Sequence, residues 1–235
     1  MPRFAAFLLS ASLLPAFGQV PNAADIVVRY VQALGGAEAL AKVSSWGAMG
    51  SFTSPTYGSM GRYEEYTKLP DRWLQTIRVP NYGVVQRCAN GTAGWEETPE
   101  FGVEELRETR LSEARRAAGF QQPARWKEMY TSLTSIGRKS VEGRPALEVR
   151  GETRDGGVDT LLFDTESGLL LAVDTRETAR DGSSRTVRLC FEDYRDVSGI
   201  RMPHTLRFVS DELIWIVRRG VAGNVPLEDS RFQKP

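Results

Sequence analysis

The sequence has little of the side-chain chemistry that most enzymes and metal sites use. It contains one histidine, His204, and two cysteines, Cys88 and Cys190, with no C-x-x-C pair. Zinc sites need several cysteine or histidine ligands at short spacing, so the composition argues against one. Nucleotide-binding loops of the Walker or G-x-G-x-x-G type are absent, as is the G-x-S-x-G turn of serine hydrolases. We therefore expect no metal and no cofactor.

The chain also lacks an excess of charge of either sign. Among 235 residues, 30 are lysine or arginine and 30 are aspartate or glutamate, so the formal net charge is zero. The basic residues are interspersed with acidic ones, as on a solvated surface. Because nucleic-acid binding needs a positive field, we expect no nucleic-acid partner.

The one long hydrophobic run lies at the N-terminus. Arg3 precedes the apolar segment 4–14, and Ala16-Phe17-Gly18 places small residues where a signal peptidase requires them. The run is short for a membrane span, although an amphipathic anchor is an alternative. We expect a signal peptide over 1–18, a periplasmic mature chain with no stable transmembrane span, and one domain over 19–235. No cysteine lies near the cleavage point, which argues against a lipid anchor there.

The two cysteines leave two interpretations open. In an oxidising compartment, Cys88 and Cys190 can form a disulfide that closes a loop of about 100 residues. They can equally remain separate thiols, because nothing in the sequence places their two strand-like segments side by side.

Short apolar or alternating segments separated by turns dominate the second half of the chain, as in antiparallel β-structure. Turn signals such as Asp155-Gly156-Gly157 and Asp181-Gly182-Ser183 recur between Gly143 and Gly220. The expected strands span 46–53, 61–68, 72–79, 83–89, 92–97, 146–151, 158–163, 169–176, 185–194, 201–209 and 212–218. Helices are expected over 23–34, 37–43 and 104–118, with a further short segment over 124–130. The fold class is α+β, with helices packed on the concave side of a curved antiparallel sheet.

Five tryptophans and several phenylalanines are spread along these strands. Their ordinary role is core packing. The functional alternative is the lining of an apolar pocket between the sheet and the helices.

Several of these segments together resemble the LolA/LolB-like superfamily of outer-membrane lipoprotein-sorting proteins. The resemblance rests, in order, on Lys68–Trp73, Asn90-Gly91 with Trp95, Phe163–Leu170, Asp181-Gly182 and Phe191–Tyr194. The segments Arg29–Gly36 and Asn224–Leu227 with Phe232 look like an exported bacterial subgroup. The resemblance covers most of the chain after residue 18.

The resemblance implies an incomplete β-barrel with helices closing one mouth, a cavity for lipid chains and no catalysis. Arg72 matches the arginine that follows the family's proline, in a strand facing the helical lid. The candidate ligand-binding residues are Arg72, Trp73, Trp95, Phe163, Phe191 and Trp215. The charged helix expected over 104–118 departs from the apolar lid of a lipoprotein carrier.

The sequence therefore predicts a periplasmic, non-enzymatic carrier or sensor of an apolar ligand. A lipid or the acyl chain of an acylated protein is the favoured partner. One alternative is a cell-envelope module that binds a protein partner and has no ligand cavity. The other is a hydrolase built around His204.

Overall fold

The computed structural model describes residues 20–56, 58–211 and 213–235. The signal peptide predicted over 1–18 lies outside them. Helix α1 (Ala23–Ala33) begins at Asn22, whose side chain accepts a hydrogen bond from the Asp25 amide. Short α2 (Ala37–Ala41) follows two glycines, Gly35 and Gly36, that both have positive φ. The mid-chain helices are α3 (Glu108–Gly119), the 3₁₀ turn η1 (Pro123–Arg125) and α4 (Trp126–Met129).

The strands form two series along the chain. The first comprises β1 (Ser45–Ser54), β2 (Ser59–Lys68), β3 (Arg72–Val79), β4 (Gly83–Asn90), β5 (Ala93–Thr98) and β6 (Gly102–Glu105). The second comprises β7 (Tyr130–Val141), β8 (Arg144–Thr153), β9 (Val158–Asp164), β10 (Leu170–Thr178), β11 (Ser184–Val197), β12 (Ile200–Val209) and β13 (Ile214–Gly223). The 3₁₀ turn η2 (Asp229–Phe232) comes near the C-terminus.

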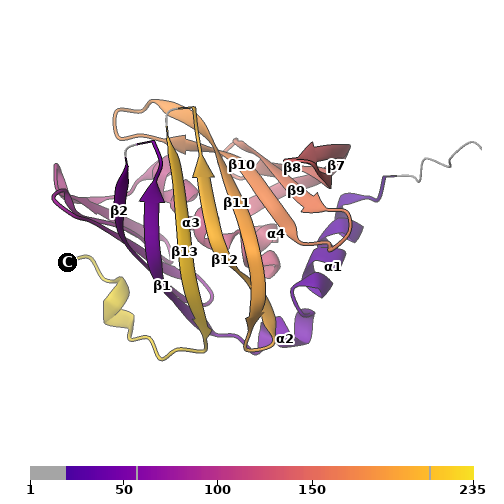
Figure 1. The fold of residues 1–235 in the computed structure, drawn as a ribbon, viewed down its shortest axis with the longest axis horizontal. Coiled ribbons are helices and arrows are strands. Elements are labelled where there is room, and N and C mark those ends of the chain that lie inside the picture. Colours follow the sequence, from indigo (N-terminus) through magenta and orange to yellow (C-terminus); the bar gives the residue numbers. More distant parts are fainter. Residues whose placement is uncertain (1–19, 57, 212) are drawn as a thin grey trace, which may run out of the picture.

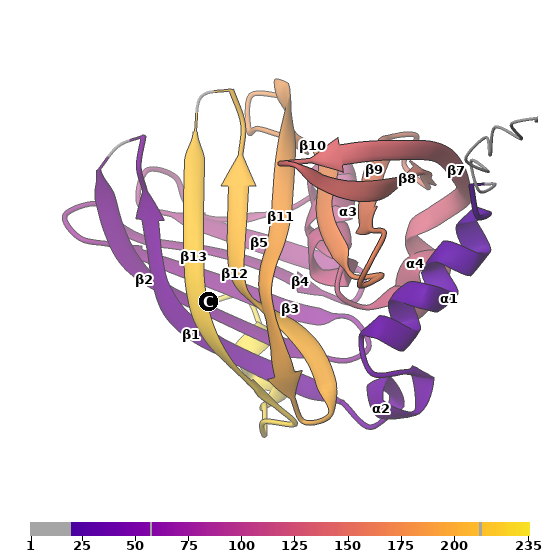
Figure 2. The same cartoon turned by 45° about the vertical axis from the view of Figure 1, so that its right-hand side comes forward.

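All strands of the described residues belong to one antiparallel sheet of thirteen strands, ordered β6-β5-β4-β3-β2-β1-β13-β12-β11-β10-β9-β8-β7. Each series is a simple meander, and the two meet where β1 pairs with β13. The segment α3–η1–α4 crosses from β6 at one edge to β7 at the other. The sheet curls around α3, so that β3–β5 run behind β12 and β13 (Figures 1 and 2). This is the predicted incomplete barrel with helices on its concave side.

One predicted helix needs correction, and one strand was not predicted. The helix expected from residue 104 begins only at Glu108, because Gly102–Glu105 forms β6. Glu104 lies directly opposite Glu96 of β5, and Arg110 bonds to both carboxylates, which removes the repulsion between like charges in this pair. Strand β7 was not predicted, since its edge position leaves most of its polar residues exposed.

The largest hydrophobic core lies on the concave side, between the sheet and helices α1 and α4. Tyr30 of α1 stacks on Trp126 of α4, with ring centroids 5.4 Å apart, and Phe163 meets both rings. Tyr30, Phe163 and Phe191 are almost fully buried. Aromatic burial of this kind stabilises the packing of α1 and α4 on the sheet.

A second cluster lies on the convex face, under the C-terminal segment. Phe232 of η2 is fully buried against Tyr66, Leu74, Cys88 and Trp95. Its carbonyl oxygen accepts a hydrogen bond from Trp95 Nε1 at 3.3 Å. The segment after β13 therefore acts as a strap that covers β2–β5 from outside (Figure 1).

The cysteines are separate. Cys88 and Cys190 are both free and buried, in different hydrophobic clusters. Burial raises the pKa of the Cys88 thiol to about 12 and that of Cys190 to about 11. No helix in the described part of the chain is both long and apolar enough to cross a membrane.

Candidate ligand cavity

A cavity of about 150 Å³ lies between the concave face of the sheet and α3. Its walls come from β1–β4 on one side, β10–β13 on the other and the C-terminal part of α3. The apolar part of the wall is formed by Trp73, Ile77, Ala117, Phe120, Val187, Leu189, Leu206, Phe208, Trp215 and Val217. Ser210 and Leu213, between β12 and β13, line the end nearest the hairpin tips.

The apolar wall follows from strand alternation. Every second residue of β12 and β13 points inward, which places Leu206, Phe208, Trp215 and Val217 on one surface. The rings of Phe208 and Trp215 meet edge to face at 6.4 Å. The part of the wall that β12 and β13 contribute is therefore aromatic and aliphatic, as in sites for apolar ligands. The charged side chains of Arg87, Arg176, Glu177 and Arg185 also line the cavity.

One end of the cavity is closed by a buried polar network. Glu65 of β2 accepts hydrogen bonds from Tyr63 Oη at 2.5 Å and Trp46 Nε1 at 3.2 Å. Arg219 of β13 binds the same carboxylate at 2.8 Å and also donates to Gln121, just beyond α3. The network links β1, β2 and β13 across the seam of the sheet, and it neutralises the Glu65 carboxylate at this end of the cavity.

The electrostatics of the network keep Glu65 and Arg219 paired. Burial opposes the charge of Arg219, but the neighbouring Glu65 carboxylate outweighs it and raises the pKa of the guanidinium. Burial, followed by the Glu65 charge, raises the pKa of Tyr63 far above its ordinary value. Tyr63 therefore stays a protonated hydrogen-bond donor.

Polar contacts hold much of α3 over the cavity. Glu113 accepts hydrogen bonds from the Thr178 amide at 2.9 Å and from Thr178 Oγ1 at 2.7 Å, which joins α3 to the end of β10. Arg116 binds Asp155 at 2.6 Å and approaches Asp159 at 3.6 Å, which joins α3 to the β8–β9 side. The apolar contacts of α3 with the sheet are made by Leu111, Ala114 and Ala118, around Trp73. The lid of this barrel is thus attached by ionic contacts as well as by small apolar side chains.

Asp159 of β9 lies in a second buried network, next to Arg116 of α3. It accepts hydrogen bonds from Tyr130 Oη at 2.9 Å and Thr175 Oγ1 at 2.6 Å. Burial raises the pKa of this carboxyl despite the nearby Arg116. The same burial, with the Asp159 charge, raises the pKa of Tyr130 well above its ordinary range.

The predicted ligand-binding residues fall in three places. Trp73 and Trp215 line the cavity. Phe163 and Phe191 lie on the same side of the sheet but inside the core around α1. Arg72 and Trp95 are on the convex face, where Arg72 pairs with Asp229 and Trp95 packs on Phe232.

Sequence reasoning missed Glu65, Arg219 and Gln121. Glu65 follows Glu64 and Arg219 follows Arg218, and in each pair alternation sends one side chain inward and the other outward. Residues two apart on a strand share a face, so Glu65 lies on the same face as the apolar Tyr63, and Arg219 on the same face as Val217. This alternation is the sequence signal that could have identified both residues as buried.

His204 is buried, and its ring Nδ1 lies 3.1 Å from the Met202 carbonyl oxygen. It is not among the residues lining the cavity. Within the described residues, no group of three or more His, Cys, Asp or Glu side chains is placed to hold a metal ion.

Similar architectures occur among solved structures. A LolA superfamily protein from Nitrosomonas europaea superposes with a TM-score of 0.58 at 15% identity, covering 92% of this chain and 99% of its own. The chain has a LolA-like fold. A domain ascribed to outer-membrane lipoprotein sorting, from Vibrio parahaemolyticus, matches this LolA-like chain with a TM-score of 0.58 at 12% identity, covering 89% and 95% of the two chains.

A DUF1329 family protein from Desulfovibrio piger gives a TM-score of 0.62 at 11% identity over 90% of this chain and 97% of its own. At the level of sequence, no protein-family model matches, and no curated protein matches either. This chain therefore resembles these proteins in its fold, and the sequence comparisons give no match.

Proposed function

We propose that this chain is a periplasmic, non-enzymatic carrier or sensor that holds the acyl chain of a lipid or of an acylated protein between its sheet and α3. The observation that carries the proposal is the apolar-walled cavity on the concave side. Each methylene of an acyl chain moved out of water into such a site contributes about 0.8 kcal/mol, so binding needs no specific polar contact. The LolA-like architecture, also seen in a domain ascribed to lipoprotein sorting, supports the same function.

The size of the cavity sets a condition on this function. A space of about 150 Å³ accepts a ligand about the size of benzene. A long acyl chain therefore requires α3 to move outward. Such a movement breaks two polar contacts of α3. Glu113 joins the helix to β10, and Arg116 joins it to the turn between β8 and β9.

The test is lipid binding by the purified protein and by a variant whose cavity is filled. We expect native mass spectrometry of the protein to show bound lipid, and a fluorescent fatty acid to be displaced by palmitate. Ala117→Trp places an indole in the cavity and should abolish both signals. Ala24→Trp, at an exposed position on α1, is the control. No lipid in the parent protein, or equal binding by Ala117→Trp, contradicts the proposal.

A further inference from the structure

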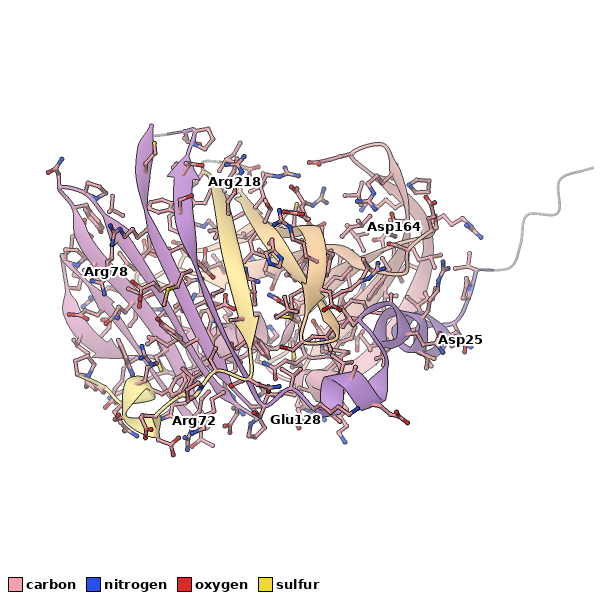
Figure 3. The ribbon with its side chains drawn as sticks, turned by 60° about the horizontal axis from the view of Figure 1, so that its bottom comes forward. Asp25, Arg72, Arg78, Glu128, Asp164 and Arg218 are labelled. Carbon is pink, nitrogen blue, oxygen red and sulfur yellow. The ribbon has the colours of Figure 1, made fainter. Side chains whose placement is uncertain are left out.

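Three arginines lie in one row across the convex face of the sheet. Arg62 of β2 is directly opposite Arg78 of β3 on one side and Ser51 of β1 on the other. Arg218 of β13 is opposite Ser51 from the far side. Neighbouring strands are about 4.8 Å apart, so the row spans four strands, with the small Ser51 side chain between Arg62 and Arg218. Figure 3 labels Arg78 and Arg218, with β2 and β1 between them.

The charge of this row is not balanced within the part of the chain that the structure describes. No ion pair there involves Arg62 or Arg218, and Arg78 reaches Glu64 only at 3.5 Å. Other arginines of the convex face are tightly paired, such as Arg188 with Asp174 at 2.5 Å. Like charges on directly opposed residues destabilise a sheet. With Glu64 counted, the row keeps two positive charges that no ion pair among the described residues neutralises.

Exposed apolar side chains flank the row on both sides. Met60 precedes Arg62 by two residues on β2 and is 67% exposed, and Met49 precedes Ser51 by two residues on β1 and is 59% exposed. The period of two residues places both methionines on the convex face with the arginines. A surface that combines unpaired arginines with flexible apolar side chains matches the boundary between headgroups and acyl chains.

We propose that the convex face of β3-β2-β1-β13 binds an anionic lipid membrane, with Arg62, Arg78 and Arg218 at lipid phosphates and Met49 and Met60 inserted between headgroups. A bilayer offers both phosphates for the arginines and acyl chains for the two methionines, whereas a purely acidic segment offers the methionines no apolar contact. The surface adjoins the β12–β13 hairpin, whose Ser210 and Leu213 line the cavity. Docking here brings these two cavity-lining residues near the membrane. The membrane contact itself does not depend on what the cavity holds.

The experiment is co-sedimentation of the full chain with vesicles at low ionic strength. One set contains phosphatidylcholine alone, and the other contains equal parts of phosphatidylcholine and phosphatidylglycerol. We expect binding to the anionic set only, and loss of that binding at 1 M salt, where the screening length is about 3 Å. The double variant Arg62→Gln/Arg218→Gln should bind about 30-fold more weakly, from the ordinary contribution of two arginines near an anionic surface.

The matched control is Arg138→Gln/Arg201→Gln, which removes the same charge from two exposed positions outside the row. It should bind like the parent. Met60→Ser, which leaves the charge unchanged, should also weaken binding and keeps the proposal testable if the double variant fails to fold. Equal binding to both vesicle sets, equal loss in the control, or no vesicle binding at all overturns the proposal. Binding to poly-glutamate without binding to vesicles overturns it in favour of an acidic protein partner.

Discussion

Arg219 and Glu65 form an ion pair at 2.8 Å, and the Arg219 side chain is wholly enclosed. The pair joins β13 to β2 through β1, on the inner side of the seam between the two strand series. Removing one member leaves the other charged and buried without a partner, which is far more costly than removing both.

Arg219→Met should therefore lower the free energy of unfolding by about 3–5 kcal/mol. The double variant Arg219→Met/Glu65→Leu should recover most of that loss, because neither charge remains. Urea unfolding of the parent, the two single variants and the double variant measures the coupling. If the double variant is as unstable as the sum of the singles, the two side chains do not depend on each other.

Phe232→Ala should open the convex cluster under the C-terminal strap. Loss of a buried phenylalanine costs about 3–5 kcal/mol, and the Cys88 thiol beneath it gains access to solvent. Mass spectrometry after brief treatment with a thiol reagent should show faster labelling of Cys88. Labelling of Cys190, which lies in a different cluster, is the internal control. Equal acceleration at both thiols means that the variant unfolds globally and that the strap has no local role.

The Asp164 carboxylate stabilises the folded protein, and this stabilisation is lost at low pH. Burial works against its charge, but hydrogen bonds from Ser167 and the Arg144 guanidinium outweigh burial, so its pKa lies below the ordinary value. A carboxyl with a lowered pKa in the folded state stabilises the protein above the unfolded pKa of about 3.9, and this contribution disappears as pH falls through the folded value. Asp164→Asn should thus be less stable than the parent at pH 7, and the difference should shrink below pH 4. Thermal unfolding across this range measures it; a constant difference contradicts the assignment.

Glu113→Ala should loosen the contact between α3 and β10. The Thr178 amide donates to the Glu113 carboxylate, so its hydrogen exchange should speed up when that acceptor is removed. Thr109→Ala, at an exposed position on the same helix, is the control and should leave Thr178 unchanged. Slow exchange at Thr178 in the Glu113 variant means that other contacts hold α3 in place.

Much of the sheet could be predicted because its strands carry local signals. The pairs Asn90-Gly91 and Asp181-Gly182 mark hairpin turns, and alternation in β11 predicts which residues face inward. The short β6 could not be separated from α3, since two adjacent glutamates at its end suit a helix equally well. Strand β7 carries few apolar residues because it is an edge strand.

The site was harder to predict, for a physical reason. Glutamate and arginine are rarely buried, so the sequence alone predicts that Glu65 and Arg219 are exposed. Their burial can be predicted only when each is known to be the other's partner. The aromatic candidates were recognised as one group, but strand alternation divides them between the two faces: Trp73 and Trp95 belong to the same sheet yet point in opposite directions. Which face an isolated strand turns toward the core depends on contacts distant in sequence.

The pairing of β1 with β13 has a consequence for how the molecule is made. These strands lie at opposite ends of the described chain, and the cavity needs both of them for its wall. A chain folding from its N-terminus can form the β1–β6 meander early, but it must wait for β13 before the seam closes. The wall of the cavity is therefore incomplete until β13 has paired with β1.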